Sequence, residues 1–134
     1  MTITLETAAN RIGMTIDPHL DVDEIMPVRT GPFAQGDLLC LPLDIKPPTG
    51  GVAVGPKGVP IIEGTHDHVL IADPGTCRWI AGAGKSTLSI GVVVADAPVH
   101  LLHAEHGGHC LAPGVWEMRG QREDSREGTR RVVD

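Results

Sequence analysis

Short apolar runs, separated by turn-forming residues, make up most of the sequence after residue 36. Several runs carry β-branched residues or alternate apolar with polar positions, and they recur about every 8–12 positions. The expected strands cover residues 38–45, 59–63, 66–72, 77–81, 86–94, 99–103, 109–112 and 115–121. This pattern predicts an all-β fold, a small barrel or sandwich that forms a single domain over residues 36–134.

The first 35 residues have a different pattern, which predicts an N-terminal arm or lead-in. Apolar positions in residues 5–12 recur at helical spacing, and Gly13 is a typical helix stop. An acidic stretch follows at residues 17–24, but it lacks the glycine and the oxygen-ligand spacing of a calcium loop.

A possible nucleotide-binding motif occurs at residues 82–87, which read Gly-Ala-Gly-Lys-Ser-Thr. A phosphate-binding loop of this type needs a glycine at position 79, which is Trp79 here, and a helix directly after the loop. The residues that follow are rich in β-branched side chains and include Gly91. We therefore expect a hairpin turn between two strands and no nucleotide cofactor.

Charge, apolar runs and cysteine spacing indicate which partners and which cellular compartment to expect. The net charge is −6 and the basic residues of the C-terminal segment alternate with acidic ones, so nucleic acid is not the expected partner. No apolar run reaches the roughly 20 residues that span a membrane, and no signal peptide begins the chain. Three cysteines without a CxxC pair do not form a disulfide framework. We expect a soluble, cytoplasmic protein.

Histidine is the most unusual chemical feature, because six of the seven histidines lie between positions 66 and 109. His66 and His68 would share one face of a strand, since side chains alternate with period two. The run from His103 through His106 to His109 would bring further imidazoles. Neutral imidazole binds Zn, Fe, Mn or Ni, so these five histidines predict a site for a divalent transition metal. His100 and His103 differ by an odd number and should face opposite ways.

Two acidic residues are candidates for proton transfer beside such a metal. Glu105 lies within the histidine run, and Asp73 follows the strand that carries His68. If the protein is an enzyme, the expected chemistry is Lewis-acid activation of water or of a chelating substrate, with Glu105 or Asp73 moving protons.

Residues 64–114 resemble the cupin barrels in part. His66-Asp-His68 followed after four residues by Asp73 is similar to the first cupin motif, with Asp in place of Glu. Gly107 and Pro113-Gly114 are similar to the start of the second motif, whose ligand histidine is absent. This resemblance implies a metal-binding barrel in which His66, His68 and Asp73 are ligands.

Residues 36–134 also resemble a group of small bacterial proteins of unknown activity. The shared elements are Gly36-Asp37, Gly64-Thr-His66-Asp-His68, His103-Ala-Glu-His106-Gly, Pro113-Gly114 and Trp116-Glu-Met-Arg-Gly-Gln121-Arg-Glu, in that order. The departures are Thr65 inside the second element and Trp116 where the group has Tyr. This resemblance supports a small β-domain family and implies no activity.

A second class of function fits the same sequence. The protein would then be a structural or adaptor protein, such as an accessory protein of a mobile element or virion. It would form homo-oligomers through its sheet edges and would dock on a protein partner through the arm or the charged C-terminal tail. The near absence of aromatic residues and of an activated nucleophile agrees with this alternative.

Overall fold

The computed structural model describes residues 4–20, 25–62, 67–82, 88–120, 122–125 and 128–131 of the 134-residue chain. The side chains are described as far as residue 120. In this described part of the chain the helix and strands follow in the order α1 (Leu5–Ile12), β1 (Val28–Arg29), β2 (Phe33–Gln35), β3 (Leu38–Leu43), β4 (Val52–Ala53), β5 (Val59–Ile62), β6 (His68–Ile71), β7 (Cys77–Ala81), β8 (Ser89–Ala95), β9 (Val99–His103), β10 (Gly107–Leu111), β11 (Gly114–Gly120), β12 (Arg122–Ser125) and β13 (Gly128–Arg131).

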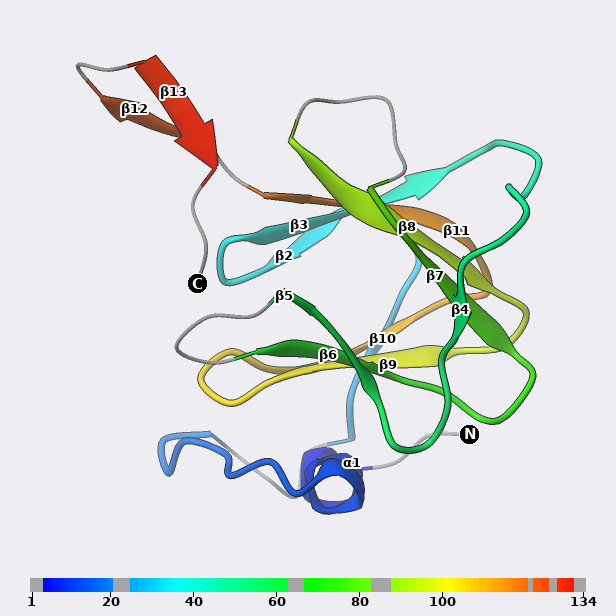
Figure 1. The fold of residues 1–134 in the computed structure, drawn as a ribbon. Helices are drawn as coiled ribbons and strands as arrows, with labels where there is room; N and C mark the ends of the chain where they lie inside the picture. The colour runs from blue at the N-terminus through cyan, green and yellow to red at the C-terminus, as the bar shows by residue number, and fades with distance from the viewer. Residues whose placement is uncertain are drawn as a thin grey trace.

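Two stacked sheets confirm the all-β prediction and show that the fold is a sandwich (Figure 1). The five-stranded sheet has the order β1-β10-β9-β6-β5, and the six-stranded sheet has the order β2-β3-β11-β8-β7-β4. Helix α1 lies against the outer face of the five-stranded sheet and forms a third layer. Strands β12 and β13 pair only with each other among the described strands.

The space between the sheets is the main core, and it is filled by alternate side chains of both sheets. Strand β11 directs Trp116 and Met118 inward, while Val115 and Glu117 lie on the outer face, as the alternation in the sequence predicts. Trp79 also lies in this core, so both tryptophans are core residues. The two sheets are therefore joined mainly by apolar burial.

Helix α1 confirms the prediction for residues 5–12. Its N-cap is Thr4, whose hydroxyl accepts a hydrogen bond from the backbone N–H of Thr7 at 3.2 Å. Gly13 ends the helix at φ 69°, in the left-handed region that favours glycine. Leu5 and Ala8 are buried against the five-stranded sheet, so this part of the arm packs on the sandwich.

The predicted hairpin between residues 77 and 94 is confirmed, because β7 and β8 pair antiparallel from Cys77↔Ala95 to Ala81↔Gly91. The Gly-Ala-Gly-Lys-Ser-Thr stretch joins these strands, and its residues 83–87 lie outside the described part of the chain. No helix follows the stretch, since β8 begins at Ser89. Among the described residues, no helix has the length and apolar character that crossing a membrane requires.

The edge strands of both sheets are short. Strands β1 and β4 have two residues each and β2 has three, while β5 contains Pro60 and a register shift. Pro42 lies in β3 beyond the end of β2, where none of the described strands pairs with that side of β3. Proline is tolerated there because its missing N–H interrupts no ladder.

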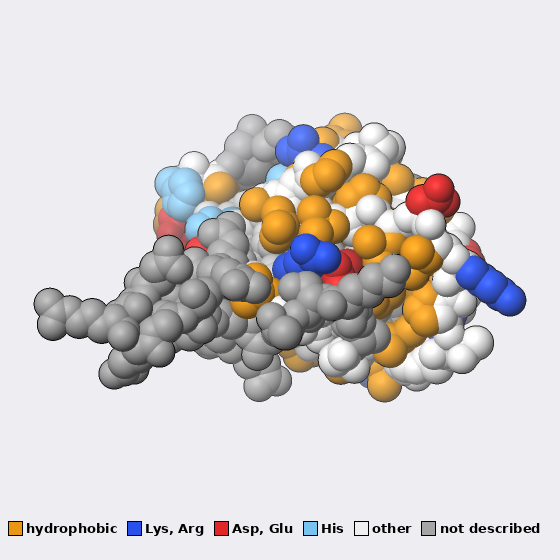
Figure 2. All heavy atoms as spheres, turned by 90° about the horizontal axis from the view of Figure 1, so that it is seen from above, with side chains coloured by type: hydrophobic (Ala, Val, Ile, Leu, Met, Phe, Trp, Pro, Cys, Tyr) orange, Lys and Arg blue, Asp and Glu red, His pale blue; other side chains and the backbone are white. Residues whose placement is uncertain are grey.

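The outer face of the six-stranded sheet carries a small apolar cluster made of Val92, Val94 and Val115, with Leu43 and Ile80 beside them. Figure 2 shows hydrophobic side chains gathered over this face, with basic and acidic side chains among them. On the same face Glu117 is buried, and its Oε1 accepts hydrogen bonds from Nε and Nη2 of Arg119 at 2.7 and 2.6 Å. Its charge is thus paired within the chain.

Gly91 is the position where added bulk should damage the core most directly. A Cβ atom there would lie 2.5 Å from Cη2 of Trp79 and 2.6 Å from the carbonyl oxygen of Ile80. We expect Gly91→Ala to lower the free energy of unfolding by about 1–3 kcal/mol, because Trp79 must shift. The control Gly31→Ala, where no atom lies within 4 Å, should change it by less than about 0.5 kcal/mol in urea titrations. Equal losses in the two variants would contradict the prediction.

Candidate functional site

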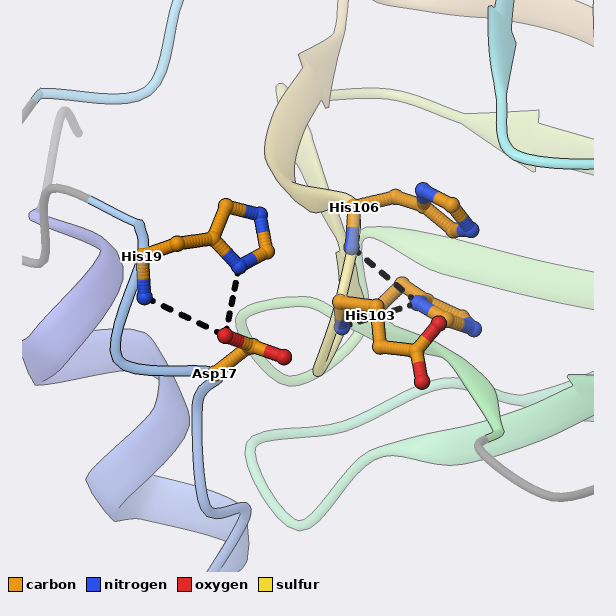
Figure 3. A network of polar contacts seen from close by, with 5 residues as sticks. Asp17, His19, His103 and His106 are labelled. Carbon is orange, nitrogen blue, oxygen red and sulfur yellow. Dashed lines mark hydrogen bonds and ion pairs between the residues drawn. The ribbon is translucent and has the colours of Figure 1, made fainter.

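Histidine side chains from two strands meet at one end of the sandwich. This end is formed by the start of β6, the turn between β9 and β10, strand β2 and the arm segment around Asp17. The backbone N–H of Asp17 donates to the carbonyl oxygen of Ala104 at 2.8 Å, which ties the arm to the turn. Figure 3 shows the segment with Asp17 and His19 beside the turn that carries His103 and His106.

His68 is fully buried at the start of β6, where its ring faces the interior of the sandwich. The Gln35 side-chain amide donates to the carbonyl oxygens of Leu101 and Gly107 at 2.9 and 3.0 Å. The Gln35 Oε1 atom lies 2.9 Å from Nδ1 of His68. Because this oxygen can only accept, Nδ1 of His68 must carry the proton. In neutral His68, Nε2 therefore holds the lone pair that a metal or a donor would use.

His103 is buried beside His68, and the two ring centroids lie 4.4 Å apart. Its Nδ1 accepts hydrogen bonds from the backbone N–H groups of Glu105 and His106 at 3.1 and 3.2 Å. In neutral His103 the proton is therefore on Nε2, which makes this nitrogen a hydrogen-bond donor. The turn thus gives His103 the opposite tautomer from that of His68.

His106 completes a row of three neighbouring imidazoles. Its ring stacks on the His103 ring with a centroid distance of 4.5 Å and an interplanar angle of 29°. Unlike the two buried rings, His106 is exposed, so the row runs from the interior to the surface. Near it, the Asp17 carboxylate accepts hydrogen bonds from Nδ1 and the backbone N–H of His19.

Of the other predicted site residues that the structure describes, Asp73 and His109 do not join this row. His66 lies outside the described residues. Asp73 is beyond the far end of β6, where its carbonyl oxygen accepts two hydrogen bonds from Thr76 in a turn. Glu105 is in the same turn as His103 and contacts it through its backbone N–H.

His109 lies on β10 in a different environment. Its Nδ1 accepts a hydrogen bond from Nε of Arg29 at 3.3 Å, and its ring lies 4.9 Å from the Phe33 ring. Burial and the positive charge of Arg29 lower the pKa of His109. The same positive charge opposes a metal cation at this imidazole.

His100 faces away from the interior, on the opposite side of β9 from His103, which confirms the expectation from their odd spacing. It is buried with Leu102 on the side covered by α1, and its Nε2 makes no hydrogen bond among the described residues. Burial, followed by the positive charge of Arg11, lowers the pKa of His100, while Asp73 and the Ile71 backbone act in the other direction. His100 therefore belongs to the packing of α1.

The row of imidazoles has two of the features that a metal site needs. One is a ligand-competent nitrogen, Nε2 of His68, and the other is a carbonyl partner for the opposite ring nitrogen, supplied by Gln35. Within the described part of the chain, however, no three His, Cys, Asp or Glu side chains are arranged so that they could hold a metal ion. The metal site therefore stays a prediction from the sequence.

Gln35 and Asp17 are the residues at this end that sequence reasoning missed. Gln35 is buried at the end of the short strand β2, where a polar residue is the available signal. Asp17 was assigned only to an acidic stretch, because its contact with Ala104 spans 87 positions and leaves no local pattern.

Gln35→Met should test how strongly the sheets depend on the buried amide. The change keeps a similar volume but removes the partners of the Leu101 and Gly107 carbonyls and of His68 Nδ1. We expect the free energy of unfolding to fall by about 2–4 kcal/mol, because buried polar groups lose their partners. Thr76→Val, which removes one exposed hydrogen bond, should cost less than about 1 kcal/mol in the same urea titration. A Gln35→Met cost no larger than that of Thr76→Val would contradict the prediction.

The buried His100 predicts a loss of stability in acid. Its folded-state pKa lies below the ordinary value of 6.5, so folding favours the neutral ring. The contribution of neutral His100 to the free energy of unfolding is fully present above pH 6.5 and is lost as the pH falls toward the folded-state pKa. We expect His100→Met to reduce the fall in unfolding free energy between pH 7 and pH 5, as measured by urea titration. Part of the fall should persist through His109. Leu102→Met on the same face should keep the wild-type dependence, and an unchanged slope in His100→Met would contradict the assignment.

Comparison with known proteins gives a family and no activity. A search of the curated proteins and a search of the solved structures found no match. One family model matches residues 34–121, which extend from β2 to the residue after β11 and include the row of imidazoles. This agrees with the expected small β-domain family, while the cupin resemblance remains unconfirmed. The chain belongs to the family described as "Domain of unknown function (DUF8820)".

Proposed function

We propose that the protein binds one divalent first-row transition metal at the histidine end of the sandwich. His68 and His106 are the proposed ligands from the described residues, and His66 is the third, assigned from its position two residues before His68 in the sequence. The observation that carries the proposal is the hydrogen bond from Nδ1 of His68 to Gln35, because it presents Nε2 of a buried imidazole as a ligand.

The surroundings of His68 support a cation at this end more than at the other histidines. Asp17 and Glu105 lie beside the turn and add negative charge, while His109 is paired with the positive Arg29. Imidazole nitrogens suit Zn, Fe, Mn or Ni, and Zn and Ni accept such ligands most readily. His103 acts here as an oriented donor rather than as a ligand, since backbone N–H groups occupy its Nδ1.

Exposure of His106 supports a site with access to solvent. A metal held by three protein ligands would keep an open position and would act there as a Lewis acid. Glu105, whose backbone is anchored to His103, is the nearby carboxylate proposed to move protons. Asp73 is not included, because it lies beyond the opposite end of β6.

The described sheet edges give little support to the alternative of an adaptor protein that assembles through them. Assembly by strand addition needs an exposed edge with several consecutive backbone groups. The described edge strands β1, β2 and β4 have two or three residues, and β5 contains Pro60. Homo-oligomer formation and docking through the arm or tail stay predictions, which size-exclusion chromatography of the same preparations would check.

Metal binding should be measured on protein purified without a histidine tag. We expect about one Zn²⁺ or Ni²⁺ per chain by elemental analysis after dialysis, and Co²⁺ absorption bands that indicate nitrogen and oxygen ligands. His106→Ala should weaken binding at least about tenfold, because it removes one of the three proposed ligands. Because the His106 side chain is exposed, its removal should leave the fold intact, which circular dichroism of the variant verifies.

Two matched controls separate the proposed site from general imidazole binding. His19→Ala removes an exposed histidine of the neighbouring arm, and His100→Met removes a buried histidine from the other face of the sheet. Both variants should bind the metal as the wild type does. Only trace metal in the wild type, or equal binding by His106→Ala, would overturn the proposal.

A further inference from the structure

A cavity of about 470 Å³ lies between the end of α1 and the outer face of the five-stranded sheet. In Figure 1 this is the side of the sheet covered by α1 and the blue segment that follows it. The cavity is separate from the row of imidazoles, because Val69 faces this side while His68 faces the interior. Its lining consists of Ile12, Met14, Thr15, Lys57, Gly58, Pro60, Asp67, Val69 and Ala104.

Apolar side chains make up slightly more than half of the lining, and polar groups make up the rest. Ile12 and Met14 contribute from the arm, Val69 and Pro60 from two neighbouring strands, and Ala104 from the β9–β10 turn. Ligand sites of small molecules are typically concave, mostly apolar and about 300–1,000 Å³ in volume, with a few placed polar groups. The volume of this cavity lies within that range.

Lys57 is held at the rim of the cavity by a tight turn. The backbone N–H of Gly58 donates to the Gly55 carbonyl oxygen at 3.1 Å, and the N–H of Ala72 donates to the same oxygen at 3.3 Å. Gly58 has φ +82°, and a Cβ atom there would lie 2.7 Å from Cγ1 of Val69. The hydrogen bond from Ala72 thus joins the turn to the sheet, and Gly58 packs against Val69 in the wall of the cavity. These contacts position the backbone of Lys57.

The two charged residues of the lining differ in how they are engaged. Asp67 already has an interaction within the chain. Lys57 makes no hydrogen bond or ion pair with the other described residues, so its ammonium group can pair with a ligand. A partly apolar cavity with one available cation at its rim matches an amphipathic anion.

We propose that this cavity binds a small monocarboxylate with a short aliphatic chain, whose carboxylate pairs with Lys57 and whose chain lies against Ile12, Met14 and Val69. A single lysine provides one charge and no bidentate fork, which suits a monoanion better than a phosphate dianion. This inference does not depend on the proposed metal, since neither His68 nor His106 lines the cavity.

Isothermal titration with four probes tests the proposal on the full chain. Hexanoate should bind at one site, whereas hexylamine and acetate should bind at least about tenfold more weakly, because each lacks one of the two required features. Hexyl phosphate distinguishes the two anion classes and should bind more weakly than hexanoate. Equal or tighter binding of hexylamine, acetate or hexyl phosphate would overturn the assignment.

Variants of Lys57 test the residue itself. Lys57→Met should weaken hexanoate binding about fivefold or more by removing the cation, and Lys57→Arg should retain most of it. The control Lys46→Met changes another exposed lysine outside the cavity and should leave binding unchanged. Wild-type affinity in Lys57→Met would contradict the proposal, and circular dichroism of each variant verifies that the fold is intact.

Discussion

The side chain of Gln35 is the polar contact on which the histidine end of the sandwich depends. It extends from the six-stranded sheet to the five-stranded sheet and there meets two carbonyl oxygens and one imidazole. A buried amide is stable only when its donors and its acceptor are all hydrogen-bonded. These contacts therefore hold β9, β10 and the His68 ring in one arrangement. The apolar core brings the sheets together, and Gln35 determines how their ends and the His68 ring are aligned.

The alternation of side chains along β9 places its two histidines in different environments. His103 faces the interior beside His68, while His100, three residues earlier, is covered by α1. A shift of the strand by one residue would exchange these environments and would place Leu101 on the helix side. The apolar pattern of β9 therefore fixes the position of the imidazoles indirectly, through the packing of the leucines between them.

Local signals in the sequence were sufficient for the helix and most strands. The boundaries of α1, β7 and β9 agree with the prediction, because capping residues, turns and apolar runs mark them directly. The start of β10 was placed at residue 109, whereas the strand begins at Gly107. Gly107 and Gly108 carry no side-chain pattern, and they join the sheet only because His103 and Leu102 pair with them.

By itself, the sequence determined the all-β class, the hairpin of β7 and β8 and the opposite faces of His100 and His103. These features depend on neighbouring residues and on the period-two geometry of a strand. Only the tertiary structure decided that the sheets form a sandwich and that His68, His103 and His106 form a row. It also decided that Asp73 and His109 lie apart from this row and that Gln35 orients His68. These relations join residues far apart in the chain, and the packing of two sheets creates them.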